Sequence, residues 1–206
     1  MKLALRIAFF ASAALMASAN YEMNVATRSM YYAGATYCDK ATLDNWTCGE
    51  PCTSIAGISS INPIENELLD TFGFVTYNSV DNEIVVSFRG TNGADFLNWM
   101  TNIVYYRVQY EDLVGSQVHS GFYTAYTSVS GQVRSAVKNL LAAHGSNTPI
   151  LFTGHSLGAA LATFAILDIK KNLNPSGTLK FYSFGSPRIG NQVFTDYFMQ
   201  TLPNVY

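Results

Sequence analysis

The chain has 206 residues, with 12 Lys and Arg, 14 Asp and Glu and a formal net charge of −2. This length suits a single domain with a substantial core, which we expect over residues 20–206. The balanced charge, without any basic block, argues against nucleic acid as a partner.

The first nineteen residues have the pattern of a secretory signal peptide. Lys2 and Arg6 precede an apolar run over residues 7–16, and Ala17-Ser18-Ala19 offers a small-residue cleavage site. The run is too short to form a stable membrane anchor. A buried amino-terminal helix is the alternative interpretation. We expect the segment to be removed and the domain to be secreted to the extracellular space.

Three cysteines follow. Cys48 and Cys52 are close enough to form a disulfide in an oxidising destination. Cys38 is then a free thiol, an intermolecular link or half of a bridge to a cysteine outside the sequence. One C-x3-C without a nearby histidine disfavours a metal site, and no cofactor is expected. Asn45-Trp46-Thr47 is a glycosylation sequon, which indicates a surface loop.

Two neighbouring strands are predicted next, over residues 72–77 and 84–88, separated by a turn at Val80-Asp81-Asn82. Apolar residues then recur at three- and four-residue steps from Phe122 to Leu141. This spacing predicts an amphipathic helix, which Gly145 and Pro149 end.

The remaining segments alternate between strand and helix. Residues 150–152 and 179–184 are predicted strands, and Ser156 to Ile169 is a predicted helix. This order predicts an α/β fold with a mainly parallel sheet and helices on both faces. No repeat or low-complexity linker divides the domain.

A G-x-S-x-G motif, Gly154-His155-Ser156-Leu157-Gly158, lies between a predicted strand and an alanine-rich helix. A serine on such a sharp turn is strained, needs glycine neighbours and lifts its hydroxyl above the sheet. The helix amino terminus favours developing negative charge. An ordinary N-capping serine is the alternative, but it would not need glycine on both sides. We predict that Ser156 is a nucleophile.

The segment from Thr153 to Ala162 resembles the elbow of the fungal-type class 3 triacylglycerol lipases. Similar blocks of that family occur in the same order at Val86–Thr91 with Asn98-Trp99, at Val118–Phe122 and at Tyr182–Asn191. The resemblance covers residues 31–206 and implies an α/β-hydrolase fold. It also implies a secreted serine carboxylic ester hydrolase that forms an acyl-enzyme on Ser156 and acts on triacylglycerol or another lipid ester, at an oil–water interface.

The substrate class stays open within the family. Relatives with the same elbow cleave feruloyl esters or, as phospholipases A1, the acyl chains of phospholipids. The apolar side chains of Phe96 and Leu97 favour long-chain lipid. The sequence gives no indication of the oligomeric state.

Two backbone donors are predicted to form an oxyanion hole. The N–H of Leu157 directly follows the nucleophile, and Thr91 follows an earlier strand, where the resemblance implies the same role. The alternative is that Thr91 only turns the chain. Asn92 to Tyr106 resembles the family's lid, with a covering helix around Ala94–Leu97; a buried core helix is the alternative.

The other members of a catalytic triad are not found. In this fold both follow the nucleophile, yet His119, His144 and His155 all precede Ser156, and we expect each to be structural. Asp168 lies twelve residues along the same helix, about 18 Å away. Asp196 falls in a helix that, in the resembling enzymes, precedes the strand with the catalytic acid.

We therefore expect the triad Asp and His to lie outside this sequence, with the carboxyl-terminal part of the fold missing. Asn204-Val205-Tyr206 resembles the start of the strand that carries the family's aspartate. Cys38 agrees, because the resembling lipases join such a cysteine to one near the carboxyl terminus. An inactive, lipid-binding remnant is the alternative function.

Overall fold

The computed structural model describes residues 21–91 and 106–203. The predicted signal peptide, the predicted lid apart from Tyr106, and Asn204-Val205-Tyr206 lie outside these residues. Within the described part of the chain, no helix has the length and apolar character needed to cross a bilayer.

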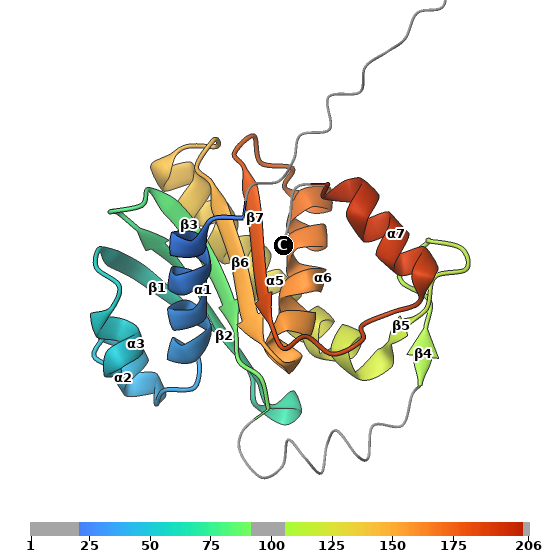
Figure 1. Cartoon of the computed structure of the whole chain (residues 1–206), viewed down its shortest axis with the longest axis horizontal. Coiled ribbons are helices and arrows are strands. Elements are labelled where there is room, and N and C mark those ends of the chain that lie inside the picture. The colour runs from blue at the N-terminus through green and yellow to red at the C-terminus, as the bar shows by residue number, and fades with distance from the viewer. Residues whose placement is uncertain (1–20, 92–105, 204–206) are drawn as a thin grey trace, which may run out of the picture.

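A five-stranded sheet forms the centre of the molecule, with the strand order β1-β2-β3-β6-β7 (Figure 1). The strands β3, β6 and β7 are parallel, as predicted, whereas β1, β2 and β3 pair antiparallel and extend the sheet on one side. The strand bounds are β1 (Ile58–Asn66), β2 (Thr71–Asn78), β3 (Glu83–Phe88), β6 (Ile150–His155) and β7 (Leu179–Phe184). A separate two-stranded sheet consists of β4 (Arg107–Val108) and β5 (Val118–His119).

Helices cover both faces of the sheet, which confirms the predicted α/β fold. One face carries α1 (Met23–Ala35), α2 (Lys40–Asp44) and α3 (Glu50–Thr53). The other carries α5 (Ser120–His144), α6 (Leu157–Asn172) and α7 (Gln192–Thr201). The short 3-10 helix η1 (Glu67–Leu69) joins β1 to β2. Neither α1 nor β1 is among the predicted elements.

The central strands supply apolar side chains to both cores. In β3, Ile84 and Val86 belong to the core beneath α5 and α6, whereas Val85 faces α1. In β6, Phe152 likewise belongs to the core beneath α5 and α6, and Leu151 belongs to the core beneath α1. Because successive strand residues point to opposite faces, a strand buried on both sides carries apolar residues at consecutive positions. β3 is buried along its whole length, and β6 is buried up to His155, where the β6–α6 turn begins.

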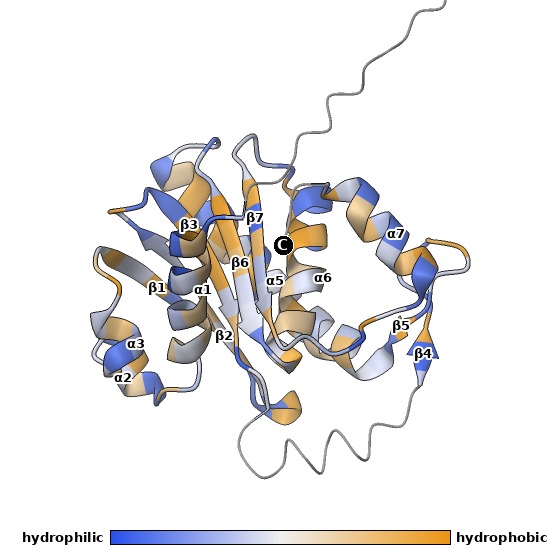
Figure 2. Ribbon diagram, in the orientation of Figure 1, coloured by the Kyte–Doolittle hydropathy of each residue, from blue (hydrophilic) through white to orange (hydrophobic). Residues whose placement is uncertain are grey.

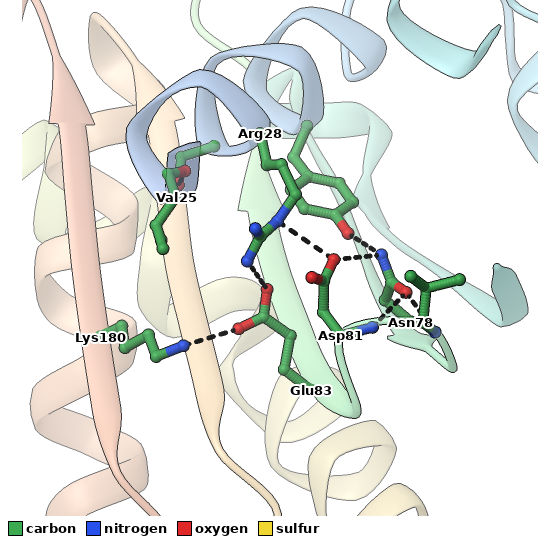
Figure 3. Close-up of polar contacts among 9 residues, drawn as sticks. Val25, Arg28, Asn78, Asp81, Glu83 and Lys180 are labelled. Atoms are coloured by element: carbon green, nitrogen blue, oxygen red, sulfur yellow. Dashed lines mark hydrogen bonds and ion pairs between the residues drawn. The ribbon is translucent and has the colours of Figure 1, made fainter. Parts of the chain in front are cut away.

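A cluster of charged side chains ties α1 to the sheet (Figure 3). Glu83 of β3 is only 1% exposed, and its carboxylate pairs with Arg28 of α1 at 3.3 Å and with Lys180 of β7 at 3.2 Å. Arg28 also pairs with Asp81 at 3.1 Å, and the amide of Asn78 donates to the hydroxyl of Tyr32 at 2.7 Å. A buried carboxylate is costly unless cations and hydrogen bonds compensate for its lost hydration. Here two cations do so, one of them from the helix.

In the segment after α1, Cys48 and Cys52 form a disulfide, which confirms the prediction. Cys38 is a free thiol among the described residues, with its sulfur 3.4 Å from the carbonyl oxygen of Cys48. The sequon residues Asn45 and Thr47 are exposed, in agreement with a surface loop.

Candidate active site

Ser156 occupies a strained turn between β6 and α6. Its backbone has φ 57° and ψ −122°, in the left-handed half of the map that non-glycine residues avoid. Its N–H donates to the carbonyl of Phe184 at 2.9 Å, and its own carbonyl accepts from Ala159 at 3.0 Å. The side chain makes no capping hydrogen bond to α6. An N-capping serine would have extended backbone angles and use its hydroxyl in that bond, so the capping interpretation does not fit.

The two flanking glycines are required by close packing. A Cβ on Gly154 would lie 2.4 Å from the carbonyl carbon and oxygen of Gly158. A Cβ on Gly158 would lie 2.1 Å from the carbonyl oxygen of Phe88, at the end of β3. Both contacts are far shorter than a van der Waals separation and involve backbone atoms, which cannot turn aside. The turn can therefore form only with glycine at both positions.

A third glycine brings the end of β3 against the serine. A Cβ on Gly90 would lie 2.7 Å from the carbonyl oxygen of His155 and 3.2 Å from the Cβ of Ser156. Thr91, the next residue, is partly exposed and lies in the loop after β3. The fold thus brings the predicted donor segment of Thr91 to the elbow, although Thr91 precedes Ser156 by 65 positions in the sequence.

The second predicted donor lies at the start of α6. Leu157 is the first helical residue, so its N–H has no acceptor within the helix and points out of the amino-terminal end. The partial positive charge at this end favours an anion. The structure therefore brings Thr91, Ser156 and Leu157 into one place.

Tyr37, which the sequence analysis did not identify, connects these segments. Its phenol oxygen accepts the N–H of Gly90 at 3.1 Å and lies 2.8 Å from Nδ1 of His155. Burial raises the pKa of the Tyr37 phenol above its ordinary value, which favours the protonated form. In the Nε2-protonated tautomer of His155, the phenol O–H donates to Nδ1. One side chain thus links the β3 loop to the elbow.

The three histidines have structural partners, as predicted. His119 caps α5, since its Nδ1 accepts the N–H of Phe122 at 3.4 Å, and burial lowers the pKa of its imidazole. His144 stacks on Tyr77 with ring centroids 3.5 Å apart. His155 contacts Tyr37.

The two carboxylates that follow Ser156 in the described chain are also engaged elsewhere. Asp168 is buried in α6, where it accepts hydrogen bonds from Tyr126, from Arg134 at 2.9 and 3.0 Å, and from Asn172. Asp196 is exposed on α7 and accepts from Gln192 at 2.7 Å. In the described part of the chain, neither carboxylate pairs with a histidine.

In the described part of the chain, neither a metal-binding cluster nor the cavity beside α7 adds a reactive group to the elbow. Over the described ranges, no group of three or more His, Cys, Asp or Glu side chains could hold a metal ion. A cavity of about 450 Å³ lies between β7 and α7, lined by apolar side chains that include Phe181, Phe194 and Phe198. Ser156 does not line this cavity, so we do not assign the cavity to the candidate active site.

Comparison with known proteins gives consistent matches. Residues 85–206 match the sequence profile of the family described as "Lipase (class 3)". The lipase of Rhizopus niveus is 30% identical over 191 residues, covering 91% of this chain and 48% of that protein. The secreted mono- and diacylglycerol lipase 1 of Fusarium solani is 33% identical and covers 83% of this chain and 51% of its own length.

Solved structures agree with these matches. The crystal structure of the lipase from Rhizopus microsporus var. chinensis superimposes with a TM-score of 0.80 and 29% identity, over 88% of this chain and 63% of that chain. These lipases have the α/β-hydrolase fold, and this chain shares it. The chain spans about half the length of the curated relatives it matches.

Proposed function

The chain belongs to the class 3 lipase family, and from this premise we propose that it is a serine ester hydrolase that cleaves acylglycerols through an acyl-enzyme on Ser156. The observation that supports this most directly is the backbone of Ser156, strained at φ 57° with its hydroxyl unused as a cap. Strain of this kind is kept where it serves a reaction. A serine with a purely structural role would relax to an unstrained turn.

In the proposed reaction, Oγ of Ser156 attacks the ester carbonyl carbon and its proton passes to a general base. The carbonyl oxygen becomes an oxyanion, which accepts hydrogen bonds from the N–H groups of Leu157 and Thr91. The intermediate collapses, the alcohol leaves with a proton, and water then hydrolyses the acyl-enzyme. Gly154 and Gly158 hold the serine in position, and His155 has a supporting role beside Tyr37.

The general base is the part of this mechanism that the described residues do not supply. The prediction is that an aspartate and a histidine outside the 206 residues complete the triad. Sequencing the transcript beyond the codon for Tyr206 tests it directly. Codons for Asp, His and Cys in frame would support the hydrolase, whereas an authentic stop codon would favour the inactive lipid-binding remnant.

We assign acylglycerols as substrates because similar proteins are described as lipases and as mono- and diacylglycerol lipases. Feruloyl esters and phospholipids are the competing substrates within the family. The proposed site of action is extracellular, which the secreted relatives and the predicted signal peptide support. Hydrolysis rates on emulsified triglyceride, phospholipid vesicles and a soluble feruloyl ester would rank the three classes.

The nucleophile is tested by covalent labelling of the full-length protein with an organophosphonate. We expect label on the peptide that contains Ser156, and none in the Ser156→Ala variant. Ser60→Ala is a matched control, since Ser60 also has positive φ, at 54°, but lies exposed in β1. Label at another residue, or on no residue, would overturn the proposal.

A further inference from the structure

Two leucines stand out from the surface at η1, between β1 and β2. Leu68 is 96% exposed, more than any other large apolar side chain in the described chain, and Leu69 beside it is 44% exposed. We call η1 (Glu67–Leu69) with its two leucines the tip. Figure 2 shows apolar colouring at the tip, in contrast to the polar segments on either side. The two leucines form a small apolar patch, and exposed apolar patches are typical of surfaces that contact an apolar partner.

The tip is rigid. The N–H of Leu69 donates to the side chain of Asn66 at 3.2 Å, and Asp70 closes the turn with φ 46° and an N–H bond to Glu67 at 3.3 Å. The carboxylate of Asp70 also pairs with Arg89. A segment that is already fixed loses little conformational entropy when it binds. The leucines are therefore held outward by the fold.

The tip lies at the same edge of the sheet as the nucleophile (Figure 1). Gly73 near the start of β2 pairs with Phe88 at the end of β3, and Phe88 pairs with Gly154 of the elbow. Arg89, which holds the tip, directly precedes Gly90, which packs against Ser156. An apolar surface that receives the leucines would therefore lie along the edge of the sheet that carries the β6–α6 turn.

The charges around the tip select the kind of surface. A polar cavity of about 310 Å³ beside it is lined by four carboxylates and two cations, namely Asp39, Glu65, Glu67, Asp70, Lys40 and Arg89. The excess of negative charge repels an anionic membrane within roughly a Debye length, about 10 Å at 0.1 M salt. A lipid surface without net charge is not repelled.

We propose that Leu68 and Leu69 insert into the surface of electrically neutral lipid aggregates and orient the Ser156 edge of the sheet towards them. The proposal rests on the proposed function, since a hydrolase of insoluble esters must reach its substrate at such a surface. It adds a binding element that is separate from the reacting groups.

The test is sedimentation of the full chain with sucrose-loaded phosphatidylcholine vesicles that contain triolein. We expect Leu68→Ser to lower the partition coefficient about tenfold, as the loss of one buried leucine implies, and the double variant with Leu69→Ser to lower it further. Replacing half of the phosphatidylcholine by phosphatidylglycerol should weaken binding of the unchanged chain at low salt.

Val80→Ser is the matched control. Val80 is 69% exposed in the turn between β2 and β3, at the opposite end of the same strands. It should leave the partition coefficient unchanged. All variants should keep the melting temperature of the unchanged chain, because the replaced side chains make few contacts in the folded state.

Equal partition of Leu68→Ser and the unchanged chain would overturn the proposal, and so would an equal loss in Val80→Ser. So would a change in sedimentation coefficient without lipid, since the tip would then join two copies of the chain. Binding is measured without turnover, so its result is separate from that of organophosphonate labelling. Tip-dependent binding without labelling would leave this proposal standing and remove the hydrolase.

Discussion

The elbow and the α1 side of the sheet are held in place by different means. At the elbow, backbone meets backbone, and Gly154, Gly158 and Gly90 are needed because a Cβ would collide with main-chain atoms. On the α1 side, long side chains reach across, from Arg28 to Glu83 and onward to Lys180. Close backbone contact requires glycine, so it can be recognised from a sequence motif. A contact between side chains of distant segments has no such motif and is found only from the structure.

The largest effect is expected from Gly158→Ala. The added Cβ would lie 2.1 Å from the carbonyl oxygen of Phe88, so β3 or α6 must move. We expect a loss of about 3 kcal/mol or more in the free energy of unfolding, measured by urea denaturation. Gly131→Ala is the control, because the Cβ at that position in α5 meets no atom within 4 Å. It should stabilise the protein by about 0.5–1 kcal/mol. Similar losses in both variants would contradict the packing argument.

A smaller loss is expected from Glu83→Gln, which leaves Arg28 and Lys180 without their shared carboxylate. Both cations are partly exposed and can turn towards water, so we expect about 2 kcal/mol, below the 3–5 kcal/mol typical of a broken, fully buried pair. Lys40→Met is the control, since its pair with Glu65 is exposed and should leave the urea midpoint unchanged. If Glu83→Gln were as stable as the unchanged protein, the pairs of Glu83 would not contribute to holding α1 on the sheet.

The smallest change in stability is expected from Tyr37→Phe, where the two regions meet. The N–H of Gly90 loses its acceptor, which should cost about 1 kcal/mol. If the β3 loop positions the oxyanion, the full-length Tyr37→Phe variant should also react with the organophosphonate roughly tenfold more slowly than the unchanged full-length protein. Tyr106→Phe serves as the control, because that ring is exposed. A normal labelling rate in Tyr37→Phe would show that the loop keeps its place without the phenol.

The same contrast explains what could be predicted from the sequence. The strands over 84–88 and 179–184, the helix that follows Phe122 and the elbow all have local signatures, namely apolar periodicity or paired glycines. In α1, Val25, Ser29 and Tyr32 do follow a helical spacing, but alanine, serine and threonine blur its apolar face. In β1, Pro63 and the irregular pairing between Ser59 and Asn62 break the alternation.

In the candidate site, too, some residues could be predicted from the sequence and one could not. Ser156 and its glycines belong to one continuous motif, and Thr91 is placed by the resemblance to a family block. Tyr37 lies 118 residues before His155, and no pattern around it indicates a partner. A contact of this kind depends on how α1 lies on the sheet, which in turn depends on the ion pairs of Arg28.

The parallel pairing of β3 with β6 has a consequence for the order of folding. Phe88 meets Gly154 only after α5 has crossed over the sheet, and Ser156 is fastened by the carbonyl of Phe184 in the following strand. Such long-range closure is slow compared with the formation of local helices. We therefore expect a newly synthesised chain to acquire its helices before Ser156 takes up its final position.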